Sequence, residues 1–177
     1  MKFLNAVSPK WLRASVYGAN DGIVTTFAVV AGVSGAGLPA SIILTLGIAN
    51  MIADGLSMGL GDYLGERSEQ KLRQQRKQSF SSSGHWETGL ITFISFVIAG
   101  SLPLLPYFLA LFGISFPYFS TFLSSIIATA CALFLVGSLR VIFTKDHWFS
   151  SGLEMLGVGA IAATVAYFLG SLIERLT

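Results

Sequence analysis

The stretch that decides the fold is ASIILTLGIANMIADGLSMGLGDYL, residues 40–64. It is far too apolar for a surface helix, yet every fourth residue in part of it is polar or carries sulfur, namely Asn50, Asp54, Met58 and Asp62. Four residues are roughly 400° of helical turn, so this polar stripe follows one helix face with a drift of about 40° per step. An ionised Asp in the middle of a spanning helix costs roughly 2.5 to 3.5 kcal/mol, and such residues usually line a bundle interior or an ion pathway.

The composition is that of a membrane protein. Of 177 residues, 53% are hydrophobic and only 11% are charged, whereas a soluble domain carries roughly 25% charged residues. We therefore expect residues 1–177 to form a single transmembrane domain in a lipid bilayer, with no nucleic acid as a partner. The first apolar run contains Asn20 and Asp21, so it does not look like a removable signal peptide.

Five spans are predicted, which makes the fold an all-α, polytopic membrane protein. Each is near the 20 or so residues needed to cross a bilayer. Glycines and prolines separate the first span from the second and the third from the fourth, so each pair should form a tight hairpin. The charged, serine-rich residues 66–87 are read as a cytosolic loop. The spans are expected at about 14–36, 40–64, 88–111, 118–140 and 152–174.

Basic residues set the expected orientation. With five spans, only Arg175 falls on the far side of the membrane. The positive-inside rule then puts the N-terminus in the cytosol and the C-terminus outside. The basic residues that share the cytosolic side are Lys2, Lys10, Arg13, Arg67, Lys71, Arg73, Arg76, Lys77, Arg140 and Lys145.

Several local signals predict packing. Three glycine pairs have the small-xxx-small spacing that lets membrane helices approach closely, and we expect the first two helices to pack tightly on each other through them. A lone Cys131 in an apolar run is expected to be a small buried hydrophobe. Ser151 and Glu154 fit a capping box at the start of the fifth helix. The glycine pairs are Gly18 and Gly22, Gly55 and Gly59, and Gly61 and Gly65.

Asp21, the only acidic residue of the first span, adds to the polar stripe. It lies eight residues after Arg13, roughly 12 Å along a helix. Met58 lies nine residues before Arg67, roughly 13 Å from the same boundary on the antiparallel helix. Asp21 and Met58 should therefore meet at one depth. The rest of the stripe extends to either side, with Asp62 a turn nearer the cytosol, Asp54 a turn deeper and Asn50 deeper still.

The ligand types favour a transition metal. Carboxylate and amide oxygens alone suit Mg²⁺ or Ca²⁺, but the soft thioether of Met58 favours Fe²⁺, with Mn²⁺, Co²⁺ or Zn²⁺ as further candidates. A carboxylate inside a membrane binds a proton when no cation is present, so metal and proton compete for one site. This predicts proton-coupled exchange without ATP. No phosphate-binding glycine loop occurs, and no cofactor is expected.

Each stripe residue also has an ordinary structural explanation. Met58 alone is more often a packing residue than a ligand. Asp62 can be solvated or pair with Arg67, and Asn50 can bridge helices by hydrogen bonding. Asp21 and Asp54 are harder to explain in this way, because neither span contains a basic residue that would neutralise them.

An enzyme is not expected. The chain has only two histidines, both outside the predicted spans, and no candidate nucleophile with a base. His85 with Glu87 can be read as a cytosolic metal relay, although a lone histidine in a polar loop is usually solvated.

Two long motifs resemble the vacuolar iron transporter family. They are YGANDGIVTT, residues 17–26, and ANMIADGLSMGLGDYL, residues 49–64. The resemblance implies a five-helix protomer that acts as a homodimer, with a pathway between the subunits. It also implies export of Fe²⁺, sometimes Mn²⁺, from the cytosol by proton exchange. Carried over to this chain, the family's membrane carboxylate is Asp21 and its methionine is Met58.

The chain departs from the family pattern in two ways. Eukaryotic relatives have further acidic residues at the positions of Ala14 and Asn50, while this chain offers Asp54 and Asp62. They also insert a glutamate-rich metal-binding domain between the second and third spans, for which residues 66–87 are too short. Such a minimal form is expected in a prokaryotic plasma membrane.

We therefore expect a homodimeric, proton-coupled exporter of Fe²⁺, and of Mn²⁺ second. Two alternatives stay open. One is a manganese-preferring exporter on the same scaffold, and the other is a non-transporting membrane subunit whose polar stripe binds a partner helix. The predicted metal site consists of Asp21, Asp54, Met58, Asp62 and Asn50.

Overall fold

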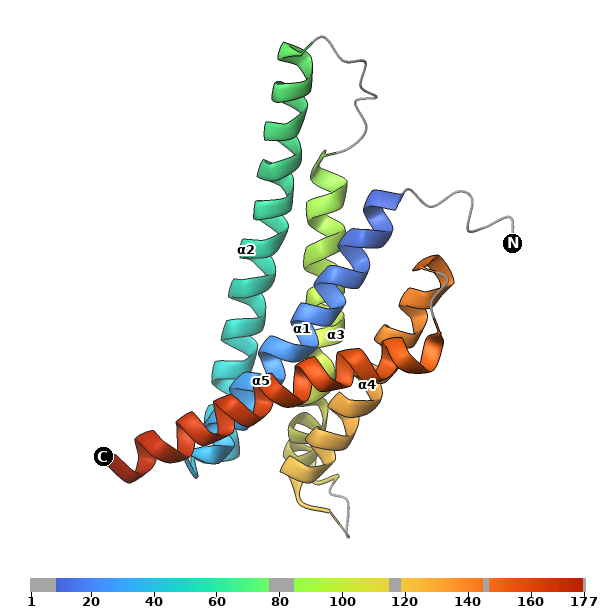
Figure 1. Ribbon diagram of the computed structural model, residues 1–177. Helices are drawn as coiled ribbons and strands as arrows, with labels where there is room; N and C mark the ends of the chain where they lie inside the picture. The colour runs from blue at the N-terminus through green and yellow to red at the C-terminus, as the bar shows by residue number, and fades with distance from the viewer. Residues whose placement is uncertain (1–8, 77–84, 115–118, 145–146, 177) are drawn as a thin grey trace.

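The computed structural model describes residues 9–76, 85–114, 119–144 and 147–176. Within these residues, five helices are long and apolar enough to cross a membrane, which confirms the predicted all-helical fold and number of spans. The helices are α1 (Pro9–Gly35), α2 (Ala40–Gln75), α3 (His85–Leu111), α4 (Thr121–Thr144) and α5 (Trp148–Leu176) (Figure 1).

Helix α3 is the element on which α1 and α2 both pack. These two helices contact α3 far more than they contact each other. At Gly18 of α1, a side-chain carbon would lie 2.5 Å from the carbonyl oxygen of Thr92 in α3. At Gly59 of α2, it would lie 2.6 Å from the carbonyl oxygen of Gly89. The expectation that the first two helices pack tightly on each other is therefore wrong. Four of the six glycines contact α3 instead, and nothing lies within 4 Å of a side-chain carbon at Gly61 or Gly65.

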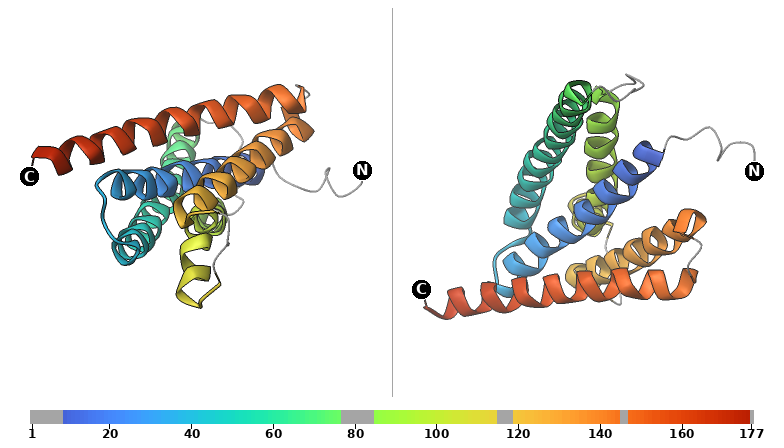
Figure 2. Two further views of the ribbon diagram at one scale, coloured as in Figure 1. Left: turned by 90° about the horizontal axis from the view of Figure 1, so that it is seen from below. Right: turned by 45° about the horizontal axis from the view of Figure 1, so that its top comes forward.

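Helix α5 packs on α1 and α4, and α4 packs on α1 and α3. Helix α5 crosses α1 and α4 (Figure 2), and the backbones of Gly170 and Gly32 touch where α5 meets α1. Ser125 of α4 donates a hydrogen bond of 2.6 Å to the carbonyl of Pro103 in α3, and both residues are buried. Most of the apolar surface of α5 remains exposed, as expected of a helix that faces lipid or another subunit.

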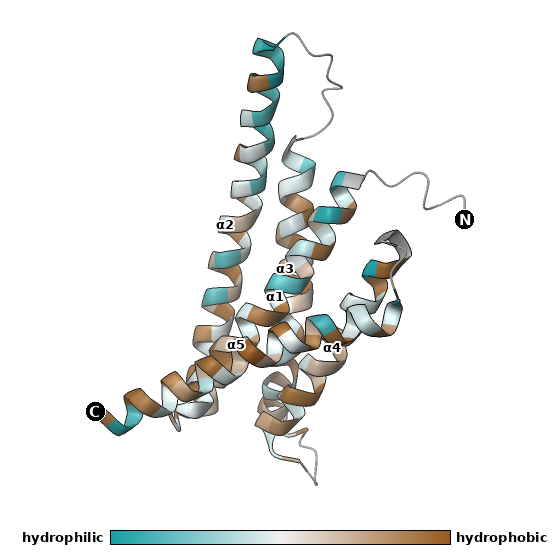
Figure 3. Ribbon diagram, viewed as in Figure 1, coloured by the Kyte–Doolittle hydropathy of each residue, from teal (hydrophilic) through white to brown (hydrophobic). Residues whose placement is uncertain are grey.

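The first predicted hairpin turn is present, whereas residues 115–118 of the second lie outside the described residues. Gly37 follows α1 with φ of 63°, and Gly113 follows α3 with φ of 75°, a left-handed backbone that favours glycine. Helix α2 continues past the expected end of its span, so the basic segment 66–75 is helical (Figure 3). Residues 77–84 of the expected loop lie outside the described residues.

Two smaller expectations are wrong. Helix α5 begins at Trp148, so Ser151 lies inside the helix and is not its N-cap. Glu154 instead forms an ion pair with Arg140 at 2.8 Å, which ties α5 to α4. Cys131 is exposed on α4 rather than buried.

Gly18→Ala is expected to destabilise the protein. The added carbon meets backbone of α3, which cannot move away as a side chain can, and overpacking of this kind typically costs about 1–3 kcal/mol. Gly157→Ala is the matched control, because nothing lies within 4 Å of a side-chain carbon there. Thermal unfolding in detergent measures both. An equal effect of the two substitutions would contradict the close approach of α1 to α3.

Candidate functional site

The polar stripe lies beside the face that α2 packs on α3. Asn50, Asp54 and Met58 each precede a buried residue by one position, which is a rotation of about 100° around the helix. The stripe residues themselves are half-buried. The polar stripe therefore lies at the edge of the contact with α3, on the side that faces α1. The buried residues are Met51, Gly55 and Gly59, with Gly47 one turn before them.

Asp21 of α1 and Asp54 of α2 come close enough for their charges to interact. Asp54 also accepts a hydrogen bond of 2.7 Å from the side-chain nitrogen of Asn50. Asn50 thus supports Asp54 within α2 rather than bridging to another helix. The depth argument from the sequence placed Met58 opposite Asp21. The structure gives Asp21 a charge interaction with Asp54, one turn from Met58, and Met58 is half-buried on the same face.

Asp62 is tied to α3. The hydroxyl of Thr92 donates a hydrogen bond to Oδ2 of Asp62, and Thr92 is fully buried. Neither solvation alone nor a pair with Arg67 accounts for this geometry, and Arg67 is exposed. The carboxylate of Asp62 is therefore held in a fixed direction by a helix other than its own.

Sequence reasoning missed the hydroxyl groups of α3. Thr88 and Thr92 lie four residues apart, on one face of a largely apolar helix, and both are buried. This is the same kind of signal as the polar stripe and could have identified them. Asn20 was also missed, and its side-chain oxygen is buried without a hydrogen-bond partner among the described residues.

The described residues of one copy do not bring together a full set of acidic, histidine or cysteine ligands for a metal ion. Among the described residues, no three His, Cys, Asp or Glu side chains come together closely enough to hold a metal ion. Asp21 and Asp54 supply two carboxylates, whereas divalent metal ions in proteins take about four to six ligands or more. A divalent ion bound by both carboxylates would need further ligands from other side-chain types, such as the thioether of Met58, from water or from a second copy.

The comparisons with known proteins point to one family of membrane transporters. A sequence model described as VIT family matches residues 12–83 and 73–171. The chain is 26% identical over 228 residues to "Vacuolar iron transporter" of Toxoplasma gondii, covering 94% of this chain and 76% of that protein. It is 25% identical over 220 residues to "Vacuolar iron transporter 1" of Tulipa gesneriana (92% and 87%) and 26% identical over 221 residues to its namesake in Arabidopsis thaliana (93% and 86%).

These alignments also locate a difference. The alignment with the Toxoplasma protein spans 228 residues, although this chain has only 177, so that protein carries sequence that this one lacks. The two segments matched by the family model overlap at residues 73–83. The two segments therefore meet at the end of α2 and in the residues that follow it.

The Asp62–Thr92 hydrogen bond is expected to give a measurable coupling energy. In a double-mutant cycle of Thr92→Val and Asp62→Ala, unfolding in mixed micelles should give a coupling of about 0.6 to 1.7 kcal/mol, the range for side-chain hydrogen bonds between membrane helices. Thr45→Val serves as the control, because the Thr45 hydroxyl bonds to Ser41 of its own helix at 2.9 Å. A coupling for Thr92 no larger than for Thr45 would show that the bond does not contribute.

Proposed function

Because this chain belongs to the VIT family, we propose that it exports divalent transition-metal ions from the cytosol, Fe²⁺ first and Mn²⁺ second, in exchange for protons. The observation that carries the proposal is the approach of Asp21 on α1 to Asp54 on α2. Two carboxylates from different helices repel each other unless a cation or a proton neutralises them. A pair of this kind within membrane-spanning helices favours a site that binds a cation and a proton in turn.

The chemistry of the site selects the ion. Asp21 and Asp54 supply hard oxygen ligands, and Met58, one turn from Asp54 on the same half-buried face, supplies a soft one. Mg²⁺ and Ca²⁺ gain little from a thioether, whereas Fe²⁺ accepts it. Asn50 positions Asp54 through its hydrogen bond, and Asp62 lies toward the cytosolic entrance. All five predicted residues therefore have a role in metal binding or entry.

Protons compete with the metal for the same carboxylates. A carboxylate that leaves water loses hydration, so its charge must be compensated by a bound cation or removed by protonation. Metal release toward the more acidic side, followed by protonation, returns the pair to a neutral state. The exchange needs no covalent chemistry and no cofactor, because the proton gradient across the membrane supplies the free energy.

The proposed orientation places the basic end of the molecule in the cytosol. The start of α1 and the extended end of α2 share this end, because Lys10 forms an ion pair with Glu66. Arg175 lies near the end of α5. By the positive-inside rule the N-terminus is cytosolic and the C-terminus external. We place the protein in a prokaryotic plasma membrane, with its five helices as one transmembrane domain.

We propose that the transporting unit is a homodimer. The coordination shell of one copy is incomplete among the described residues, and a second copy related by a two-fold axis can supply matching ligands. Next to the polar stripe, α2 exposes a row of small residues that would let two α2 helices approach closely. This row is Ala49, Ala53, Ser57 and Gly61.

Proteoliposomes test the transport function. With a proton gradient, the protein should take up Fe²⁺ and Mn²⁺, and Co²⁺ or Zn²⁺ less well, and an ionophore that dissipates the gradient should stop uptake. Asp21→Ala and Asp54→Ala should each lower uptake at least about tenfold, because even groups that merely support a metal ligand contribute about 10- to 100-fold to affinity. Glu154→Ala, which removes a carboxylate of α5, is the control.

If correctly folded protein takes up no divalent ion at any pH gradient, the proposal is wrong and the partner-binding alternative is favoured. Normal transport by Asp21→Ala would overturn the site while leaving the transport function intact.

Met58→Leu tests the role of the thioether. Leucine has nearly the same volume, so packing is kept, and Fe²⁺ uptake should fall more than Mn²⁺ uptake. Competition between the two ions in the same vesicles gives the ratio directly. Equal losses of Fe²⁺ and Mn²⁺ uptake would contradict the role of the thioether in favouring Fe²⁺. A wild-type preference for Mn²⁺ would favour the manganese-preferring exporter.

Disulfide cross-linking tests the dimer. In a Cys131→Ser background, Ser57→Cys should link two copies on mild oxidation in the membrane, because residues near a two-fold axis meet their own counterparts. Ile161→Cys is the control, since Ile161 is exposed on α5, away from the proposed contact. Efficient linkage through Ile161 and none through Ser57 would place the interface elsewhere.

A further inference from the structure

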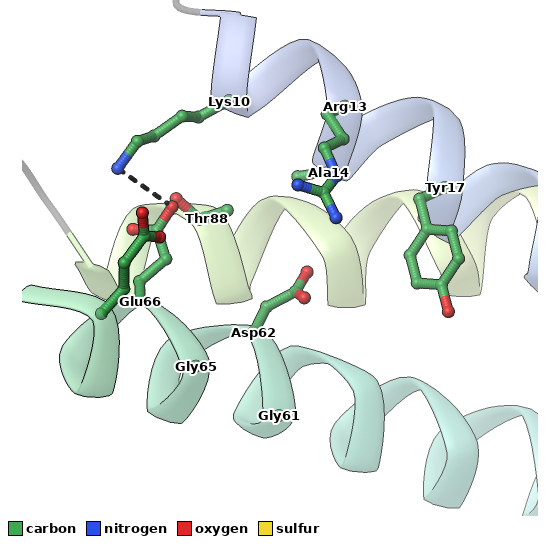
Figure 4. A pocket seen from close by; sticks show the side chains of 10 residues that line it. Lys10, Arg13, Ala14, Tyr17, Gly61, Asp62, Gly65, Glu66 and Thr88 are labelled. Atoms are coloured by element: carbon green, nitrogen blue, oxygen red, sulfur yellow. Dashed lines mark ion pairs between the residues drawn. The ribbon is translucent and has the colours of Figure 1, made fainter. Parts of the chain in front are cut away.

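A cavity of about 390 Å³ lies where α1 begins and α2 extends past its apolar stretch. Figure 4 shows side chains of α1 and α2 facing each other across it, with Thr88 of α3 at its wall. We call it the mouth cavity. Its charged and hydroxyl-bearing lining residues are Lys10, Arg13, Tyr17, Asp62, Glu66, Glu69 and Thr88.

An ion pair spans the mouth cavity. The ammonium nitrogen of Lys10 lies 3.5 Å from Oε1 of Glu66. The side chain of Glu66 is only 14% exposed, whereas that of Lys10 is 43% exposed. The anion is therefore fixed in the wall, and the cation reaches it on a long, flexible stem from the solvent side. Such a cation can leave without disturbing the helices.

Thr88 adds an uncharged oxygen to the same wall. The residue is 6% exposed, and its hydroxyl oxygen has no hydrogen-bond partner among the described residues. Buried hydroxyl groups are normally paired, so this one indicates that a ligand or water belongs beside it. Asp62 lies four residues before Glu66, and both side chains line the cavity.

We propose that the mouth cavity is an entry site for a hydrated divalent cation, bound by Glu66, Asp62 and the hydroxyl of Thr88. The Lys10 ammonium is a tethered cation that occupies Glu66 until the metal displaces it. This inference rests on the proposed transport function and names its first binding step.

Size and charge both fit a hydrated ion. Six waters occupy roughly 180 Å³ at about 30 Å³ each, so the ion and its water shell fit the cavity. The described residues bring no three His, Cys, Asp or Glu side chains close enough to hold a bare ion. Glu69 is turned toward Arg73, whose Nε donates to it at 3.0 Å, which leaves Glu66 and Asp62 as the carboxylates for the ion. Contact through water gives weak, fast exchange, as an entry site requires.

The test measures initial rates of Mn²⁺ uptake into proteoliposomes at varied Mn²⁺ concentration. Lys10→Met should lower KM roughly two- to five-fold, the size of effect that a half-exposed ion pair exerts. Glu66→Gln and Thr88→Val should raise KM, while Thr88→Ser, which keeps the hydroxyl, should not. In the double variant Lys10→Met with Glu66→Gln, removal of the lysine should have no further effect. Lys71→Met is the control for loss of a positive charge, because Lys71 is exposed outside the cavity.

If the ion pair were merely structural, Lys10→Met would not lower KM. Removal of Lys10 would then leave Glu66 without its cation and destabilise the protein. If the wild-type protein transports Mn²⁺ and Lys10→Met has an unchanged or higher KM, the inference is wrong. Equilibrium Mn²⁺ binding to the full-length protein in micelles separates the two proposals. Binding that tightens in Lys10→Met without any transport would support the entry site and defeat the transport function, whereas no Lys10-dependent change in binding would defeat the entry site.

Discussion

The close approach of α1 and α2 to the backbone of α3 is the constraint on which the rest of the structure depends. Gly18 and Gly59 lie against α3 with no room for a side-chain carbon, so the helix axes are fixed by backbone contact rather than by adaptable side chains. The positions of the residues beside these glycines are therefore fixed as well. Asp62 is further bound to Thr92, the residue whose backbone Gly18 touches, so all three helices are coupled at one level.

This arrangement explains how two acidic side chains remain close inside a membrane protein. Asp21 and Asp54 repel each other, and nothing in their own interaction would hold α1 near α2. Both helices are instead held by contacts with α3, and the glycine contacts among them are independent of charge. A cation or a proton can therefore relieve the repulsion without unfolding the bundle.

The sequence predicts a large part of this fold, because five long apolar runs leave few alternatives in a bilayer. The polar stripe and Asp21 could also be found from spacing alone. The helix that contacts the glycine pairs could not be predicted, since small-xxx-small spacing specifies close approach but not which helix approaches. Depth counting places Met58 opposite Asp21, and the structure adds a charge interaction of Asp21 with Asp54, one turn from Met58. Helix α2 extends beyond its apolar stretch because residues 66–75 are good helix formers, a propensity that hydropathy does not measure.

The length of α2 has a consequence for how proteins of this kind diversify. Its 36 residues make a rod of about 54 Å, much longer than the roughly 30 Å of a bilayer's hydrocarbon. The projecting end makes no contribution to the glycine contacts with α3, and the two segments matched by the family model meet there. It is therefore a position where evolution or a protein engineer can add a whole module outside the bilayer while the membrane-embedded helices keep their geometry.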